Sequence, residues 1–158
     1  MRVVSKLKAA ICYLSYSGNT EEVAELISST LNQKGFELDM HRIGIDAPID
    51  PKSYDYLFLG TFTWEMGSTP DEVKEFILEI GYKPQNMYIF GTGDTQFGGD
   101  DLFCKAVDKL VKFYKSKQTG LKIEQSPRGV QESKVRGWVE GVVKHAIEKG
   151  ENIRTYTS

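Results

Sequence analysis

Apolar residues along the chain follow two alternating patterns, short continuous runs and longer stretches with helical spacing. Runs such as residues 7–15 and 54–61 are typical of strands that are buried on both faces. Between these two runs, Val23, Ile27 and Leu31 recur at helical spacing and indicate a helix with one buried face. The alternation predicts an α/β protein with a parallel sheet and helices on both faces.

The same patterns divide the whole chain into strands and helices. Strands are expected at residues 7–15, 36–43, 54–61, 86–93 and 121–125. Helices are expected where apolar residues recur within 23–31, 73–80, 103–114 and 135–146. Residues 44–53 link the second and third strands and leave room for a short helical turn.

Local signals refine two of these helices. "TPDE", residues 69–72, has the spacing of a capping box and predicts Pro70 at the first helical position. Gly137 and Gly141 weaken the last helix intrinsically, and we expect them to allow its close approach to the sheet.

Length and composition limit the class of protein. The 158 residues fit one domain, which we expect to cover residues 1–150 with a loose tail at 151–158. No run of about 18 apolar residues occurs, so we expect no membrane association, and no feature suggests nucleic acid as a partner. Cys12 and Cys104 match no metal spacing, and two free thiols favour a reducing cytoplasm.

Charge is distributed unevenly along the chain although the formal net charge is −2. Residues 60–101 contain 2 Lys or Arg and 8 Asp or Glu, whereas residues 102–158 contain 12 and 6. Such a separation can orient a charged partner during its approach. Solvated helix faces explain these counts equally well.

Ligands of parallel α/β sheets bind beyond the carboxyl ends of the strands, which directs attention to loops 15–20, 61–67 and 92–99. The first loop, "SYSGNT", carries several hydroxyl groups, and residues 14–27 contain no Lys or Arg. Because a helix N-terminus adds unpaired N–H groups, we interpret this loop as a site for a phosphate that is bound and not transferred. A plain capped turn with Asn19 or Thr20 as N-cap is the alternative.

Other phosphate sites of α/β proteins fit this sequence poorly. A P-loop requires a Lys that is absent here, and residues 18–23 and 91–96 both fail the dinucleotide pattern G-x-G-x-x-G. A cysteine phosphatase would need an Arg after Cys12. A phosphoacceptor receiver would have an Asp where Gly60 and Thr61 stand.

The second and third loops contribute flat side chains. "TFTWEMG", residues 61–67, contains Trp64, which can stack on a ring or alternatively pack into the core. "GTGDTQFGGDD", residues 91–101, combines backbone freedom with Asp94 as an acceptor and Phe97 as a second flat face. Two aromatic walls beside a phosphate loop predict a flat, phosphorylated ring as the ligand.

These motifs resemble the flavodoxin family, and the resemblance covers nearly the whole chain. "SYSGNT" is similar to the family's S/T-x-S/T-G-N-T phosphate loop, "TFTW" to its ring-stacking loop, and "GTGD" followed by "FCKAVD" to its third loop and helix. The resemblance implies a flavodoxin-like, five-stranded parallel sheet of order 2-1-3-4-5. It also implies noncovalently bound FMN and one-electron transfer by a protein of the short-chain type.

The resemblance further implies roles for particular residues, none of them catalytic. The phosphate would be held by Ser15, Tyr16, Ser17, Gly18, Asn19 and Thr20. One side of the flavin would be held by Thr61, Phe62, Thr63, Trp64, Glu65, Met66 and Gly67. The other side would be held by Thr92, Gly93, Asp94 and Phe97.

Three features depart from the family pattern. Glu65 follows the Trp where Gly is frequent, so turning over that peptide toward the reduced ring would carry a conformational cost. Phe97 replaces a frequent Tyr, and "FGGDD" lengthens the third loop, which makes the alignment of Phe97 less secure than that of Asp94.

The resulting expectation is a monomeric, cytoplasmic bacterial flavodoxin without an enzymatic activity of its own. It would carry single electrons from a flavodoxin/ferredoxin-NADP reductase to acceptor enzymes, and an acidic rim around the site would meet their basic surfaces. The residues of this rim are Glu65, Asp71, Asp94, Asp100 and Asp101. The alternatives are a flavodoxin-like activator of manganese ribonucleotide reductase, an FMN-dependent quinone or NAD(P)H oxidoreductase, and a binding module that has lost its flavin.

Overall fold

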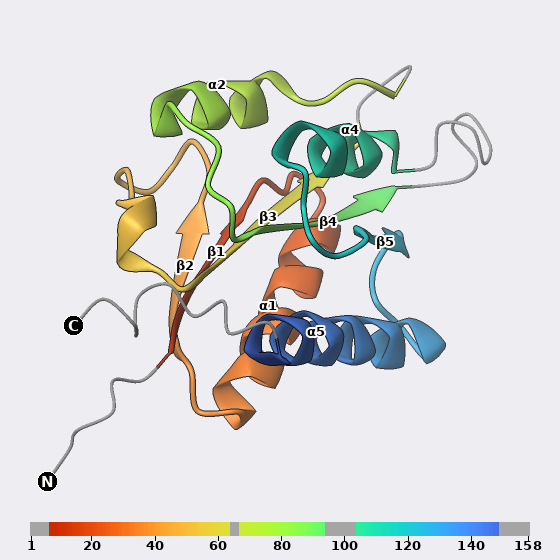
Figure 1. The fold of residues 1–158 in the computed structure, drawn as a ribbon. Coiled ribbons are helices and arrows are strands. Elements are labelled where there is room, and N and C mark those ends of the chain that lie inside the picture. The colour runs from red at the N-terminus through yellow and green to blue at the C-terminus, as the bar shows by residue number, and fades with distance from the viewer. Residues whose placement is uncertain (1–6, 64–66, 94–103, 149–158) are drawn as a thin grey trace, which may run out of the picture.

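The computed structural model describes residues 7–63, 67–93 and 104–148, which form one parallel sheet with helices on both faces (Figure 1). The strands are β1 (Lys8–Tyr13), β2 (Glu37–Arg42), β3 (Tyr56–Phe62), β4 (Met87–Gly93) and β5 (Leu121–Glu124). The helices are α1 (Asn19–Gln33), the short 3₁₀ turn η1 (Pro51–Ser53), α2 (Asp71–Ile80), α4 (Lys105–Tyr114) and α5 (Val130–Glu148). Every predicted element is therefore present, and η1 is the turn for which the link between β2 and β3 left room.

The strand order is β2-β1-β3-β4-β5, and every neighbouring pair is parallel. This order confirms the expected fold class. Alternate residues of β2 are exposed at one edge of the sheet, as its alternating sequence predicted. The central strands β1, β3 and β4 are almost entirely buried because helices cover both of their faces.

Two separate hydrophobic layers cover the two faces of the sheet. Successive residues of a strand point to opposite faces, so Ala9 and Ile11 pack with α1 and α5, whereas Ala10 and Cys12 pack with α2 and α4. Figure 1 shows the same division, with α2 and α4 above the sheet and α1 and α5 below it. Helices α2 and α4 therefore cover one face of β3 and β4, and each helix follows the loop after one of these strands.

Close packing between the sheet and a helix occurs at a strand glycine, Gly91, and not at the glycines of the last helix. A Cβ built on Gly91 would lie 2.5 Å from Val107 Cγ2 and 2.6 Å from the Thr61 carbonyl oxygen. A Cβ on Gly137 would meet nothing within 4 Å, and one on Gly141 would meet the Gln118 side chain. The expectation that these two helical glycines allow a close approach to the sheet was therefore wrong, because Gly137 is exposed and the half-buried Gly141 lies against Gln118 and not against a strand.

The start of α2 also differs from the prediction. Pro70 is extended, with φ −57° and ψ 145°, and occupies the N-cap position, so that Asp71 is the first helical residue. The N-cap residue itself offers no side-chain hydrogen bond, and the Pro70 carbonyl accepts from the N–H groups of Val73 and Lys74. The predicted tail at 151–158 lies outside the described residues.

Candidate functional site

The sheet register brings the ends of β1, β3 and β4 together. Tyr13 is paired with Gly60, and Phe62 is paired with Thr92. The loops that follow these strands therefore emerge side by side at the carboxyl ends of the strands, although they are far apart in the sequence. Parallel α/β sheets bind their ligands at this carboxyl end.

The first loop leads directly into α1 through a left-handed glycine. Gly18 is the N-cap residue with φ 95°, a backbone conformation that glycine adopts without strain. The Ser15 hydroxyl accepts from the Gly18 N–H at 3.1 Å, which closes the loop on itself. Because the first N–H groups of a helix have no acceptor within it, this end of α1 can bind an anion.

The hydroxyl side chains of this loop point in different directions. Ser17 is exposed, whereas Thr20 is only 1% exposed and points into the protein. The Thr20 hydroxyl shares a 2.7 Å hydrogen bond with the Thr92 hydroxyl at the end of β4. A hydroxyl group both donates and accepts, so Thr20 keeps its proton for another acceptor if Thr92 is the donor.

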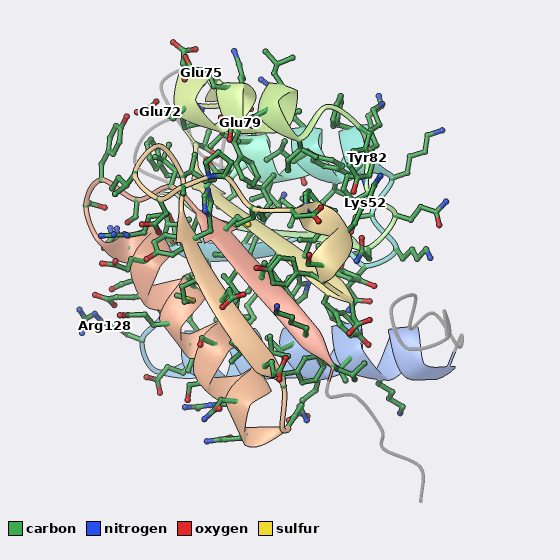
Figure 2. The ribbon with its side chains drawn as sticks, turned by 90° about the vertical axis from the view of Figure 1, so that its left-hand side faces the viewer. Lys52, Glu72, Glu75, Glu79, Tyr82 and Arg128 are labelled. Carbon is green, nitrogen blue, oxygen red and sulfur yellow. The ribbon has the colours of Figure 1, made fainter. Side chains whose placement is uncertain are left out.

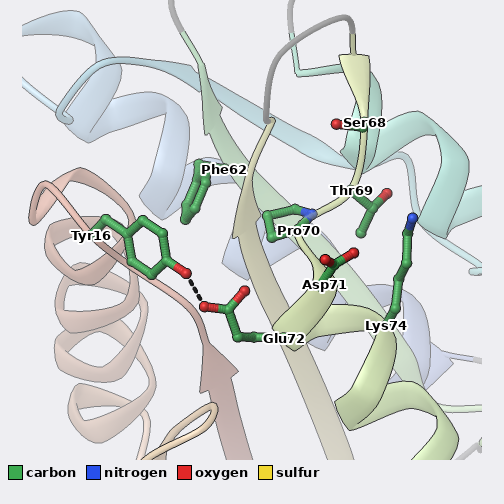
Figure 3. Close-up of a pocket in the computed structure, with 8 residues that line it drawn as sticks. All are labelled: Tyr16, Phe62, Ser68, Thr69, Pro70, Asp71, Glu72 and Lys74. Carbon is green, nitrogen blue, oxygen red and sulfur yellow. Dashed lines mark hydrogen bonds between the residues drawn. The ribbon is translucent and has the colours of Figure 1, made fainter.

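Tyr16 connects the first loop to the second loop and to α2. The residue is 60% exposed, and the centroid of its ring lies 4.9 Å from that of Phe62. Its hydroxyl donates to the Glu72 carboxylate in the first turn of α2. Figure 3 shows these three side chains along one wall of a pocket of about 320 Å³, which is completed by Ser68, Thr69, Pro70, Asp71 and Lys74.

The described residues of the second loop are held from within the fold. Thr61 is fully buried and its hydroxyl donates to the Phe62 carbonyl oxygen at 2.8 Å. The Thr63 hydroxyl accepts from the Ala106 N–H at 3.1 Å, and the Gly67 carbonyl accepts from Lys109 Nζ at 2.9 Å. Both flanks of positions 64–66 are therefore attached to α4.

The third loop is described as far as Gly93. The Gly93 carbonyl oxygen accepts from the Gln125 N–H at 2.8 Å, which ties this end of β4 to the residue after β5. The structure thus brings together the first loop, residues 61–63 and 67, and residues 92–93. The remaining predicted site residues, Trp64, Glu65, Met66, Asp94 and Phe97, lie outside the described residues.

Acidic side chains follow the outer side of α2 beside this pocket. Glu72, Glu75 and Glu79 are spaced three and four positions apart and lie along one side of the helix (Figure 2). Glu75 and Glu79 are exposed, and Glu72 is half-buried against Tyr16. The surface next to the candidate site is therefore negative.

Neither cysteine offers a nucleophile to the site. Burial raises the pKa of the Cys12 thiol and of the Cys104 thiol to about 12. Both thiols are therefore protonated at neutral pH. Within the described ranges, no three His, Cys, Asp or Glu side chains form a group that could hold a metal ion.

Comparison with known proteins identifies the family. The flavodoxin family model matches residues 11–137. This chain belongs to the flavodoxin family. It is 34% identical to a probable flavodoxin 2 of Bacillus subtilis over 139 residues, which cover 81% of this chain and 89% of that protein. Members of the flavodoxin family bind FMN and transfer electrons.

Solved flavodoxin structures share this architecture. The crystal structure of oxidised flavodoxin 2 from Bacillus cereus superposes with a TM-score of 0.75 at 30% identity, covering 87% of this chain and 99% of that one. Flavodoxin 1 from the same organism gives a TM-score of 0.77 at 26% identity, covering 87% and 98%. No helix in the described part of the chain is long and apolar enough to cross a membrane.

Sequence reasoning missed the contacts that join the loops to neighbouring helices. The bond from Tyr16 to Glu72 links residues 56 positions apart, and the bond from Ala106 to Thr63 links residues 43 apart. No spacing along the sequence signals such contacts. One available clue was Cys104, which precedes α4 and is a poor N-cap residue.

Proposed function

We propose that this chain binds FMN at the carboxyl ends of β1, β3 and β4, between loops 15–20, 61–67 and 92–99, and that it carries single electrons. The phosphate of FMN would be held by N–H groups of the first turn of α1 and by hydroxyl groups of the first loop, Ser17 in particular. Trp64 and Phe97 would flank the ring. When bound, FMN supplies the redox chemistry, and the residues of the chain hold it and shield it from water.

The observation that carries this proposal is the phosphate loop itself. Gly18 in the left-handed conformation begins α1, the loop offers hydroxyl groups, and residues 14–27 contain no Lys or Arg. A site for a phosphate that remains bound needs donors but no cation to assist transfer. These features fit the phosphate of a resident cofactor better than that of a substrate.

The proposal includes the partners and the location. A flavodoxin/ferredoxin-NADP reductase would donate electrons, and acceptor enzymes would receive them through basic surfaces that fit the acidic side of α2. Negative charges near the cofactor disfavour adding another negative charge, so the last electron would be accepted at low potential. We place this monomeric carrier in the cytoplasm, which suits its two unpaired, buried thiols.

Anaerobic reductive titration of the purified protein with FMN tests the proposal. A carrier of single electrons takes up two electrons in separate stages, each with its own absorbance spectrum. It also fails to oxidise NADH or NADPH unless a reductase is present. Uptake of both electrons in one stage together with NADH turnover by the protein alone would instead identify an FMN-dependent oxidoreductase.

A further inference from the structure

Helix α4 begins without a cap of its own. Cys104 is its N-cap residue, with φ 51° in the left-handed region, and its side chain makes no capping hydrogen bond. The first N–H groups of any helix need acceptors from elsewhere. The Ala106 N–H finds one in the hydroxyl of Thr63, so a side chain of the second loop completes the first turn of α4.

A second contact joins the same loop to the same helix. Lys109 lies three residues after Ala106 and therefore on the same side of α4. Its ammonium group donates to the Gly67 carbonyl oxygen at 2.9 Å. Gly67 is buried and has φ 76°, which places its carbonyl in an orientation that other residues rarely adopt.

The helix that receives both contacts is itself fixed to the sheet. Val107 and Leu110 are buried between α4 and the sheet, and Gly91 lets Val107 approach the backbone of β4 closely. Attachment to a fixed helix limits the movement of the chain at residues 63 and 67, so less conformational freedom is lost when a ligand binds beside them. We therefore expect the attachment to affect ligand affinity as well as the fold.

We propose that Thr63 and Lys109 are positioning residues that hold the two flanks of the second loop, at residues 63 and 67, in place for the flavin ring. The inference rests on the proposed function, because it assumes that this loop contacts the ring. Tyr16 of the first loop contacts Phe62, but the end of that loop at the start of α1 is held by other contacts, namely those of Ser15 with Gly18 and of Thr20 with Thr92. Losing the attachment to α4 should therefore weaken binding of the ring and leave phosphate binding unchanged.

Dissociation constants for FMN and for riboflavin, measured by flavin fluorescence quenching, test this inference. Thr63→Val and Lys109→Gln each remove one hydrogen bond, and we expect each to weaken both ligands by the same factor, about 5- to 10-fold. Thr63→Ser and Lys109→Arg keep the donor or acceptor and should restore most of the affinity. In the cofactor-free protein, Thr63→Val should also speed amide exchange at Ala106.

Lys112→Gln is the matched control for charge. Lys112 is exposed on the same helix, and the substitution removes the same positive charge without touching the second loop. Wild-type affinity is expected for this variant. Equal losses for Lys112→Gln and Lys109→Gln would show that only the net charge matters and would overturn the inference.

Two further outcomes would also overturn it. One is wild-type affinity in both Thr63→Val and Lys109→Gln, which would show that the attachment does not act on the site. The other is a loss for FMN with none for riboflavin, which would assign the effect to the phosphate. If the unmodified chain bound neither flavin, both the proposed function and this inference would fail. Normal binding by the unmodified chain without losses in the variants would overturn this inference alone.

Discussion

The hydroxyl groups of Thr20 and Thr92 share a buried 2.7 Å hydrogen bond that joins the first turn of α1 to the end of β4. Thr20→Val leaves the Thr92 hydroxyl buried without this partner, and we expect the free energy of unfolding to fall by about 1–3 kcal/mol. The double variant with Thr92→Val should cost less than the sum of the two single variants, because both polar groups are then absent. Urea denaturation measures all three, and additive costs would contradict the expectation.

Two Gly→Ala substitutions should change stability in opposite directions. Gly91→Ala places a methyl group 2.5 Å from Val107 Cγ2 and 2.6 Å from the Thr61 carbonyl oxygen, so we expect a loss of about 1–3 kcal/mol. Gly137→Ala adds a methyl group with nothing within 4 Å on an exposed side of α5, so we expect a gain of about 0.5–1 kcal/mol. Thermal unfolding compares them, and a loss in Gly137→Ala would refute the second expectation.

Two buried tyrosines should respond differently to loss of their hydroxyl groups. Among the described residues, no partner accepts from or donates to the hydroxyl of Tyr114, whereas the Tyr54 hydroxyl donates to Asp39 at 2.7 Å. Tyr54→Phe should therefore lower the free energy of unfolding by about 0.5–1.5 kcal/mol, while Tyr114→Phe should be neutral or stabilising. Chemical denaturation of the pair checks this, and a larger cost for Tyr114→Phe would indicate a water-mediated contact at its hydroxyl.

Stability should fall as the pH drops through the titration range of His41. This side chain is 4% exposed and packs against Phe76, and burial lowers its pKa below the ordinary value of 6.5, although Asp46 and Glu79 partly oppose the shift. Below pH 6.5 the unfolded chain takes up a proton that the folded protein resists, so acidification favours unfolding. This contribution is absent at higher pH, where the residue is neutral in both states.

His41→Phe isolates this contribution because the variant keeps a flat ring that cannot take a proton. Denaturation at several values between about pH 7.5 and 5.5 should show wild-type stability falling relative to the variant. A constant difference across this range would show that burial of His41 does not control the pH dependence.

The acidic side of α2 should govern the rate of electron transfer from a basic reductase. Replacing Glu72, Glu75 and Glu79 together by Gln should slow the reaction about 10-fold at low ionic strength and much less at high salt, because salt screens exposed charges. Glu140→Gln, on the exposed side of α5, is the control at a site remote from the loops. An unchanged rate in the triple variant would remove α2 from the docking surface.

The pattern of apolar residues was sufficient to predict the sheet and its helices, since buried parallel strands are continuous apolar runs and the covering helices have one apolar side. The first loop was equally visible, because hydroxyl groups, Gly18 and the start of a helix are adjacent in the sequence. Local rules were less reliable where the backbone had alternatives. The capping pattern at residues 69–72 suggested Pro70 as the first helical residue, yet its extended ψ makes it the N-cap.

Contacts between distant residues could not be predicted in this way. The capping of α4 by Thr63 and the bond from Lys109 to Gly67 depend on how closely α4 approaches the end of β3, which tertiary packing decides. Gly137 and Gly141 illustrate the same limit, because sequence shows that a helix contains glycine but not which side of it faces the sheet.

The strand order has a consequence for how such a chain can be enlarged. All three loops of the proposed site follow the three inner strands β1, β3 and β4, while β2 and β5 form the two edges of the sheet. An insertion within an edge strand, or a domain fused beyond α5, would leave the spacing of the three loops unchanged. The edges are therefore where evolution or protein engineering can add new segments and new partners while the cofactor site is retained.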